Sequence, residues 1–318
     1  MDEDPIGRPD GAVYSRKRRA MKPSKLLKGL RVDDPHRFSL ASVDPSGTAG
    51  LSKSAAEPML DDQMKRLRDL QERLYAEHRW AVLVVLQGMD AAGKDGIVEH
   101  VMTGVNPQGC DVHPFKAPDG EELDHDFLWR AALRLPRRGH IGIFNRSYYE
   151  ETLAVRVHPA LLDRQQLPGT LVGKHIWQER FHDIRGFERH LARSGVVVLK
   201  FFLHISKEEQ RQRLLARIEE PDKRWKFSLG DIAERTLWKK YASAYEDMIR
   251  ATSRPYAPWH VVPADHKWLA RLVVAIAMVD ALEKLDLEFP KIKGAARKAL
   301  ATVGRALVSE GRGSATYR

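Results

Sequence analysis

The sequence predicts an α/β fold in which about five mostly parallel strands carry helices on both faces. Three observations favour this fold class. Short apolar runs alternate with longer segments of helical periodicity, the order expected of parallel strands joined by crossover helices. The first apolar run leads directly into a glycine-rich segment and then into a helical one. The chain has 318 residues, 43% of them hydrophobic, which is enough for a large core.

Hydrophobic periodicity predicts the individual elements. The predicted strands are short and rich in Val, Ile, Leu or Phe, and they comprise residues 81–86, 110–115, 141–144, 196–205 and 259–262. The predicted helices comprise about residues 56–74, 94–102, 121–135, 174–193, 210–219, 231–248 and 266–287. Ser206 and Ser228 are each followed three residues later by an acid, a capping-box pattern that marks a helix start. Asp265 is the expected cap of the last helix.

The basic charge of the chain lies at its two ends. Residues 1–32 hold nine Lys or Arg and four Asp or Glu, and residues 291–318 hold seven and one, whereas the 258 residues between them sum to −1. A near-neutral body predicts no specific nucleic-acid partner and places any polyanion site in a local patch. We expect a basic, partly disordered N-terminal extension over 1–45, a main domain over 46–290 and a basic C-terminal tail over 291–318.

The sequence gives no sign of a membrane or an export signal. No apolar run reaches the length of a membrane span, and the first residues, Met1-Asp2-Glu3-Asp4, lack an apolar signal core. Cys110 is the only cysteine, which excludes an internal disulfide and favours a reducing compartment. We therefore expect a cytoplasmic protein with no membrane partner.

The segment after the first predicted strand has the spacing of a phosphate-binding loop. Four residues separate Gly88 from Gly93, and Lys94 follows directly. Glycines let backbone N–H groups close around phosphate oxygens, and the lysine reaches the outer phosphates. The next helix would direct the positive end of its dipole at the anion. We call residues 88–94 the phosphate loop.

Two acids of this segment are candidate ligands of Mg²⁺. Asp95 follows the lysine, where a Ser or Thr would usually contact the metal, but the helix dipole alone also favours an acid in a first turn. Asp90 has no such structural reason inside the loop, and an unpaired carboxylate among phosphates requires a cation. We therefore predict Asp90 as the metal ligand, with Asp95 as the alternative.

Residues after the third predicted strand belong beside the phosphate loop, because the carboxyl ends of parallel strands meet at one edge. Arg146 can stabilise charge on a transferring phosphoryl group, although a structural salt bridge is the alternative. Asn145 precedes it. Glu150 is a candidate adenine or ribose contact or an indirect metal ligand, and equally a helix-start acid. Lys116 and Arg130 bind phosphate or nucleotide only if the fold places them in the groove.

A basic region follows the fourth predicted strand. Arg213 and Arg217 lie at four-residue spacing, and Lys223 and Lys226 follow closely. Like charges so placed repel unless an anion lies among them. We interpret about residues 207–230 as a lid that closes over phosphates, and a solvated helix face is the alternative.

These segments resemble the family 2 polyphosphate kinases, and within that family the branch that phosphorylates both AMP and ADP. The resemblance covers about residues 45–290 and rests on residues 86–96 (LQGMDAAGKDG), 104–107 (GVNP), 144–150 (FNRSYYE) and 225–228 (WKFS). Asp95 is ordinary in that family, whereas many of its members have Asp at the position of Asn145.

The resemblance implies a P-loop kinase core like that of thymidylate kinase, with a helical lid. It implies phosphoryl transfer between inorganic polyphosphate and adenine nucleotides, with Mg²⁺ as the cofactor, and we expect a homo-oligomer. Asp90 and Lys94 would lie at the reaction centre, while Arg146 and the lid bases grip the phosphates. Two alternatives remain: an ATP-dependent nucleoside monophosphate kinase on the same core, and a polyanion-binding protein without catalysis.

Overall fold

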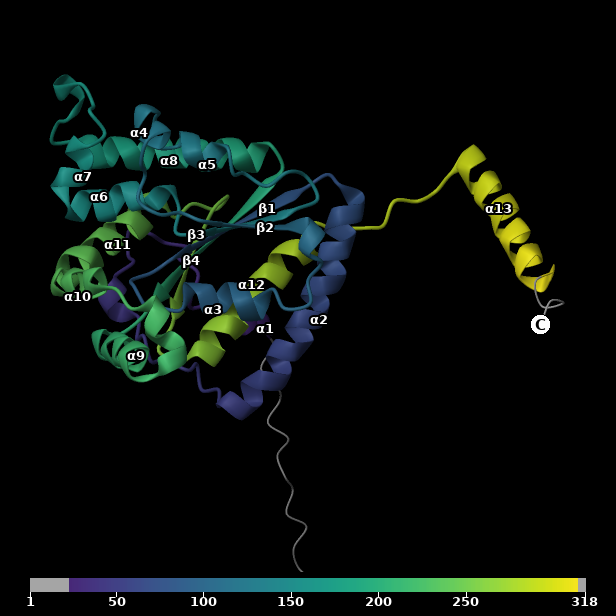
Figure 1. The fold of residues 1–318 in the computed structure, drawn as a ribbon, viewed down its shortest axis with the longest axis horizontal. Coiled ribbons are helices and arrows are strands. Elements are labelled where there is room, and N and C mark those ends of the chain that lie inside the picture. The colour runs from purple at the N-terminus through teal and green to yellow at the C-terminus, as the bar shows by residue number, and fades with distance from the viewer. Residues whose placement is uncertain (1–22, 314–318) are drawn as a thin grey trace, which may run out of the picture.

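A five-stranded parallel sheet forms the centre of the fold in the computed structural model, which describes residues 23–313 (Figure 1). The strands are β1 (Ala81–Gln87), β2 (Cys110–Pro114), β3 (Ile141–Asn145), β4 (Val196–His204) and β5 (Trp259–Pro263). Their order is β2-β3-β1-β4-β5, and every neighbouring pair is parallel. The predicted fold class is confirmed. Every residue of the central strand β1 is buried, which explains its uninterrupted apolar run.

Two layers of helices cover the sheet. The helices are α1 (Pro23–Leu27), α2 (Lys53–Glu77), α3 (Lys94–Val101), α4 (Glu121–Asp124), α5 (Trp129–Ala132), α6 (Ala154–Val157), α7 (Pro159–Asp163), α8 (Ile176–Arg193), α9 (Lys207–Glu219), α10 (Leu229–Thr236), α11 (Trp238–Thr252), α12 (Lys267–Glu283) and α13 (Gly294–Gly313). Alternate residues of β1 face opposite layers, as the pleat of a strand requires. Val82 and Val84 belong to the core with α2, α3 and α12, whereas Leu83 and Val85 belong to the core with α8 and α11.

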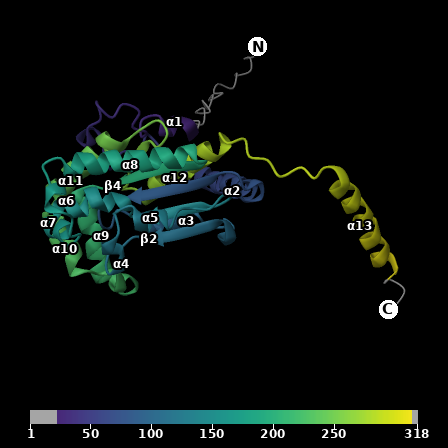
Figure 2. The ribbon, with the colours of Figure 1, turned by 90° about the horizontal axis from the view of Figure 1, so that it is seen from above.

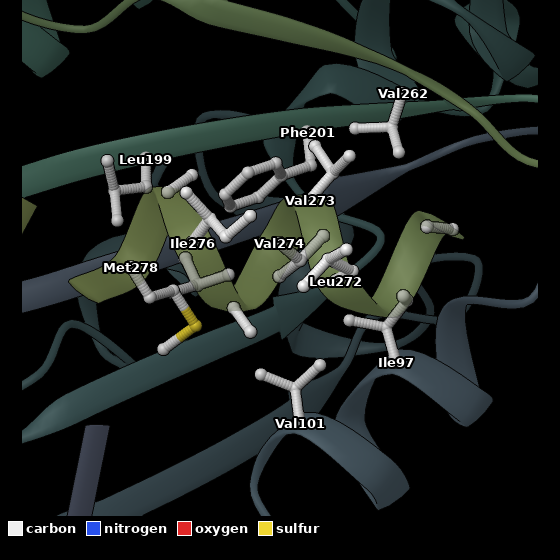
Figure 3. Packing of buried hydrophobic residues seen from close by; sticks show 14 of the residues in the cluster. Ile97, Val101, Leu199, Phe201, Val262, Leu272, Val273, Val274, Ile276 and Met278 are labelled. Carbon is white, nitrogen blue, oxygen red and sulfur yellow. The ribbon is translucent and has the colours of Figure 1, made fainter. Parts of the chain in front are cut away.

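Helix α12 is the apolar centre of its layer. Figure 3 shows Val273 and Ile276 beside Phe201 and Leu199 of β4, with Val101 of α3 beneath the helix. Full burial of one such side chain stabilises the fold by about 1.5–3 kcal/mol. The helix that follows the phosphate loop is therefore held against the sheet by α12.

The predicted helix over residues 121–135 is wrong. The structure has two short helices there, α4 and α5, with a break at residues 125–128. The side chain of Asp126 accepts a hydrogen bond from the backbone N–H of Leu128 at 2.9 Å. Such a local side-chain bond competes with helical backbone bonding, which explains the break.

The helix caps agree with the sequence in part. Ser206 is confirmed as the cap of α9, because its Oγ accepts from the N–H of Glu209 at 3.0 Å. Ser228 caps α10 through the N–H of Gly230 instead of the residue three positions on. The prediction for Asp265 is wrong. Its Oδ1 accepts from the N–H of Ser206 at 2.7 Å, because the ends of β4 and β5 bring these residues together.

The N-terminal segment from Pro23 onward lies against the body. Leu26 and Leu27 are buried in the α12 core. Beside β5, Val32 donates its N–H to the carbonyl of Trp259 at 2.8 Å, and Val261 donates to that of Leu30 at 2.7 Å. The body therefore includes residues that the sequence assigned to the N-terminal extension. The part of the predicted N-terminal extension that precedes Pro23 lies outside the described residues.

Helix α13 stands apart from the body in both ribbon views (Figures 1 and 2). The sequence predicted only a basic tail here. Leu300, Val303 and Leu307 are exposed on the helix, and so are the residues of the connection from Lys291. Among the described residues, 23–313, no helix combines the length and the apolar character needed to cross a membrane.

Two truncations are expected to affect stability very differently. Removal of residues 1–32 should lower the free energy of unfolding by about 3–6 kcal/mol, because Leu26 and Leu27 each lose burial worth about 1.5–3 kcal/mol. Removal of residues 291–318 should leave it nearly unchanged, because the described part of this segment is exposed. Denaturant unfolding of both truncated chains is the measurement. Equal destabilisation by the two truncations would show that α13 packs on the body.

Candidate active site

The phosphate loop joins β1 to α3 at the carboxyl edge of the sheet. Gly88 has φ = 158°, and a Cβ at this position would lie 2.9 Å from the carbonyl oxygen of Leu203. Gly93 has φ = 107°, a conformation that other residues rarely adopt. The backbone therefore requires both glycines that the spacing singled out. Helix α3 begins at Lys94, so its free N–H groups open at the loop.

Lys94 is folded back over its own loop. Its Nζ donates to the carbonyl oxygens of Gly88 at 2.7 Å and Met89 at 3.2 Å. The side chain is buried, and this desolvation, with the nearby charge of Arg146, lowers its pKa to about 8. Lys94 is thus held inside the loop as a charge that a phosphate group would stabilise.

Arg146 lies directly after β3 and faces the loop. It adopts a left-handed conformation, with φ = 64°. Its Nη2 donates to Oδ1 of Asp90 at 2.5 Å, and its Nη1 lies 3.7 Å from Oε2 of Glu150. The pKa of Arg146 is raised, first by Glu150 and also by Asp90. Arg146 therefore forms salt bridges, as its alternative structural role predicted. It also lines the groove described below.

The two candidate metal ligands both have protein partners. Asp90 binds Arg146, so the expectation of an unpaired Asp90 is wrong. Asp95 accepts a hydrogen bond from Nδ2 of Asn145 at 2.6 Å. Across residues 23–313, no group of three His, Cys, Asp or Glu side chains is placed to hold a metal ion. Mg²⁺ commonly binds through one or two carboxylates together with substrate phosphates, and the two aspartates fit that arrangement.

A groove of about 610 Å³ runs along the phosphate loop. Its lining contains nine Lys or Arg and four Asp or Glu, and the bases are Lys94, Lys116, Arg146, Arg213, Arg217, Lys223, Lys226, Lys267 and Arg271. Such an excess of base in a concave site attracts polyanions. Sequence analysis missed Lys267 and Arg271, whose four-residue spacing at the start of α12 was the available signal.

A second cavity, of about 350 Å³, adjoins the groove. Phe115, Lys116 and Arg146 line both spaces, and Glu150 lines the second. The structure thus places Lys116 in the groove. Arg130 lies in the wall of the second cavity instead, where its Nη1 donates to the carbonyl of Lys116 at 2.7 Å and its guanidinium lies over the ring of Phe115.

A family model described as Polyphosphate kinase 2 (PPK2) matches residues 50–290. The chain belongs to this family. It is 51% identical over 250 residues to a protein of Rhodopseudomonas palustris named ADP-polyphosphate phosphotransferase, covering 78% of this chain and 86% of that protein. It is 47% identical over 274 residues to the AMP/ADP-polyphosphate phosphotransferase of Meiothermus ruber, covering 86% and 98%.

The fold agrees with that of a solved polyphosphate kinase 2. The crystal structure from Arthrobacter aurescens TC1 aligns with a TM-score of 0.81 and 41% sequence identity, over 92% of this chain and 98% of that one. The five-stranded parallel sheet and the site at its edge therefore lie in the part of the chain that it shares with the family.

The bases of the predicted lid have partners within the protein. Arg217 of α9 donates to Asp231 of α10 at 2.6 Å. Lys223 pairs with Glu220, and Nζ of Lys226 lies 4.9 Å from the centre of an exposed tryptophan ring. Acids that lie nearby in the fold thus relieve the repulsion expected among these bases.

Behind the site lies a buried ion pair that sequence analysis missed. Lys200 of β4 and Glu188 of α8 are fully buried and 2.6 Å apart. Oε1 of Glu188 accepts from the hydroxyls of Tyr148 and Tyr149, which follow Arg146 along the chain. This network anchors the segment that presents Arg146. The available signal was a lysine inside an otherwise apolar strand, because such a charge needs a buried partner.

The variant Glu188→Ala is expected to lower the free energy of unfolding by about 3–5 kcal/mol, since it leaves Lys200 buried and unpaired. Denaturant unfolding measures this loss. The exposed Asp183 lies on the same helix, and Asp183→Ala serves as the matched control. The double variant Glu188→Leu/Lys200→Met should recover most of the stability, because it removes both charges. Equal losses for Glu188→Ala and Asp183→Ala would contradict the proposed cost of an unpaired Lys200.

The lowered pKa of Lys94 predicts a pH dependence of turnover. Lys94 is protonated below pH 8 and loses its charge above that pH, so kcat/KM should fall as the pH rises through about 8. Phosphates bound beside Lys94 favour its protonated form, so kcat should stay constant up to a higher pH than kcat/KM does. Initial rates across pH 6–10, with melting temperatures as the control for unfolding, measure both parameters. A kcat/KM that stays constant through pH 9 would exclude this role for the Lys94 charge.

Proposed function

We propose that this protein transfers phosphoryl groups between inorganic polyphosphate and the adenine nucleotides AMP and ADP. The observation that carries the proposal is the meeting of two concave sites at Arg146. One is a long basic groove along the phosphate loop, and the other is a smaller cavity beside it. Two substrates that each bring a phosphate chain would meet at that residue.

The groove suits a phosphate chain. Its nine bases and four acids leave an excess of positive charge. The bases are spread over the phosphate loop, the segments after β2 and β3, α9, the segment after α9, and α12. A long polyanion that spans the groove would meet several of these charges at once. Arg217, Lys223 and Lys226 of the proposed lid would exchange their present partners for phosphate oxygens.

The second cavity suits the nucleotide. Its wall combines the aromatic ring of Phe115 with Arg130 and Glu150. Because the guanidinium of Arg130 lies over that ring, it is the guanidinium plane that can stack against a nucleobase. A carboxylate can accept hydrogen bonds from ribose hydroxyls or from an exocyclic amine. Lys116 borders both spaces and would contact the nucleotide phosphate. In this arrangement the acceptor phosphate points toward Arg146.

The residues at the junction supply positioning and charge. Phosphoryl transfer asks for little covalent chemistry from the protein, so alignment and neutralisation of charge dominate. Lys94 and Arg146 lie where negative charge would develop on the transferring group, and free N–H groups of α3 point at the same place. Asp95 and Asn145, joined by a hydrogen bond, close the edge of the groove.

Asp90, with Asp95 as the alternative, would hold Mg²⁺ together with the substrate phosphates. The metal would neutralise and align the phosphate oxygens when bound. The names of two relatives pair polyphosphate with ADP, or with both AMP and ADP, which supports these nucleotides as acceptors here. Assembly into a homo-oligomer stays a prediction.

The test is a time course with Mg²⁺, long-chain polyphosphate and AMP, in which the nucleotides are separated. We expect ADP first and then ATP. ADP without ATP at high polyphosphate concentration would restrict the acceptor to AMP. Turnover with ATP and AMP but none with polyphosphate would identify an ATP-dependent nucleoside monophosphate kinase. Salt-dependent polyphosphate binding with no turnover at all would leave only polyanion binding.

A further inference from the structure

Arg213 of α9 uses all its hydrogen-bond donors on the protein. A guanidinium has five N–H donors. The five acceptors, at 2.6–3.0 Å, are Oε1 of Glu209 for Nε, the carbonyls of Ala91 and Ala92 for Nη1, and those of Ala264 and Asp265 for Nη2. The side chain is only 9% exposed. Although Arg213 borders the groove, it has no donor left for a phosphate oxygen.

Gln210, one turn earlier on α9, binds the same loop. Its side chain is buried, and its Nε2 donates to the carbonyl oxygen of Asp90 at 3.0 Å. Nη1 of Arg235 donates to the Oε1 of Gln210 at 3.0 Å and so fixes the orientation of its amide. Gln210 and Arg213, the loop clamp, therefore hold the carbonyl oxygens of three consecutive residues, 90–92.

This arrangement determines which way the loop backbone faces. In a trans peptide the C=O and the next N–H point in opposite directions. Carbonyls 90 and 92 point at α9, so the N–H groups of Ala91 and Gly93 point away from it. Lys94 holds the two preceding carbonyls, of Gly88 and Met89. Five consecutive carbonyl oxygens, which would repel a phosphate, are thus occupied by protein donors.

We propose that Gln210 and Arg213 are positioning residues, which hold the phosphate loop in its anion-binding conformation, and that Arg213 does not bind phosphate itself. The expected effect of these residues on turnover rests on the proposed function. The inference revises the sequence-based assignment of Arg213 as a phosphate ligand. It also makes the face of α9 that carries Gln210 and Arg213 part of the loop's support, and it leaves the movable lid to the residues beyond Arg213.

The variant Arg213→Lys separates the two roles, because lysine keeps the charge but lacks the five-donor geometry. We expect kcat, per folded protein, to fall on the order of a hundredfold while the KM for polyphosphate changes little, as for a misplaced catalytic group. Arg211→Lys is the matched control on the same helix. Arg211 is exposed and, among residues 23–313, bonds only to Glu208, so its replacement should leave both parameters unchanged. A normal kcat with a raised KM in Arg213→Lys would show that Arg213 binds phosphate and would overturn the proposal.

Hydrogen exchange gives a readout that does not depend on turnover. Amides of residues 88–95 should exchange faster in Arg213→Lys than in the unmodified protein, with no change in β1 or β4. Gln210→Leu removes one of the clamp's bonds and should show the same local change, with a kcat lower on the order of tenfold. Gln210→Leu is the test variant if Arg213→Lys does not fold. Unchanged exchange of the loop in the folded variants would overturn the clamp, whereas an unmodified protein inactive with polyphosphate would count only against the proposed function.

Discussion

Replacing Lys94 with alanine is expected to lower turnover by about a hundredfold to a thousandfold, the cost of losing one preorganised charged donor. Lys94 lines the groove beside the loop carbonyls that it binds, where it would supply a point charge to the transferring group. Its desolvated ammonium contributes little to stability, as its lowered pKa shows. The fold should therefore survive the change. Steady-state rates with polyphosphate and AMP, together with circular dichroism and melting temperature, are the measurements.

The exposed Lys65 on α2 provides the matched control. Lys65→Ala removes the same charge from a residue that lines neither the groove nor the second cavity, and it should leave the rate unchanged. Retained turnover in Lys94→Ala with a normal spectrum would refute the phosphate-loop assignment. A collapse of the melting temperature would instead show that Lys94 supports the loop structure.

Asp90→Asn is expected to cost far more turnover than Asp95→Asn, on the order of a hundredfold or more. Asp90 binds Arg146 at the junction of the groove and the second cavity, and it is also the first candidate ligand of Mg²⁺. An amide would weaken both interactions because it carries no charge. Asp95 lies in the first turn of α3, and among the described residues its carboxylate pairs with an amide. Asp95→Asn therefore removes a weaker interaction and should cost less turnover.

Turnover of both aspartate variants as a function of Mg²⁺ concentration is the test. A higher Mg²⁺ requirement in Asp90→Asn would locate the metal role there. A lower rate with an unchanged Mg²⁺ requirement would attribute the effect to the loss of the Arg146 contact. If Asp95→Asn is the more damaging variant, the metal role belongs to Asp95 and our interpretation of the centre is wrong.

The sequence by itself determined the sheet and the phosphate loop. The positions of the strands and of the loop along the chain depend on residues that are neighbours in the sequence. A strand buried on both faces must be apolar at every position, as β1 is. The loop needs residues that tolerate its backbone angles, and Gly88 and Gly93 stand where φ is 158° and 107°. The same local segments carried the resemblance to the family that the chain proved to belong to.

Only the tertiary structure decided which charged groups meet at the site. Spacing on α9 made Arg213 and Arg217 look equivalent, yet Arg213 is fully bonded to backbone carbonyls and Glu209, while Arg217 pairs with Asp231. Arg130, which the sequence made a binding candidate only if the fold placed it in the groove, lies in the wall of the adjoining cavity, and the bases of α12 were missed.

The physical reason is the same in each case. A side chain's partner depends on where other segments cross the sheet, and those segments can be far away in the sequence. The carbonyl that Gln210 holds belongs to Asp90, 120 residues earlier. Local periodicity places a residue on a helix face, but it does not say what that face meets. The packing around α9 places one of its arginines against the phosphate loop and another beside a carboxylate of α10.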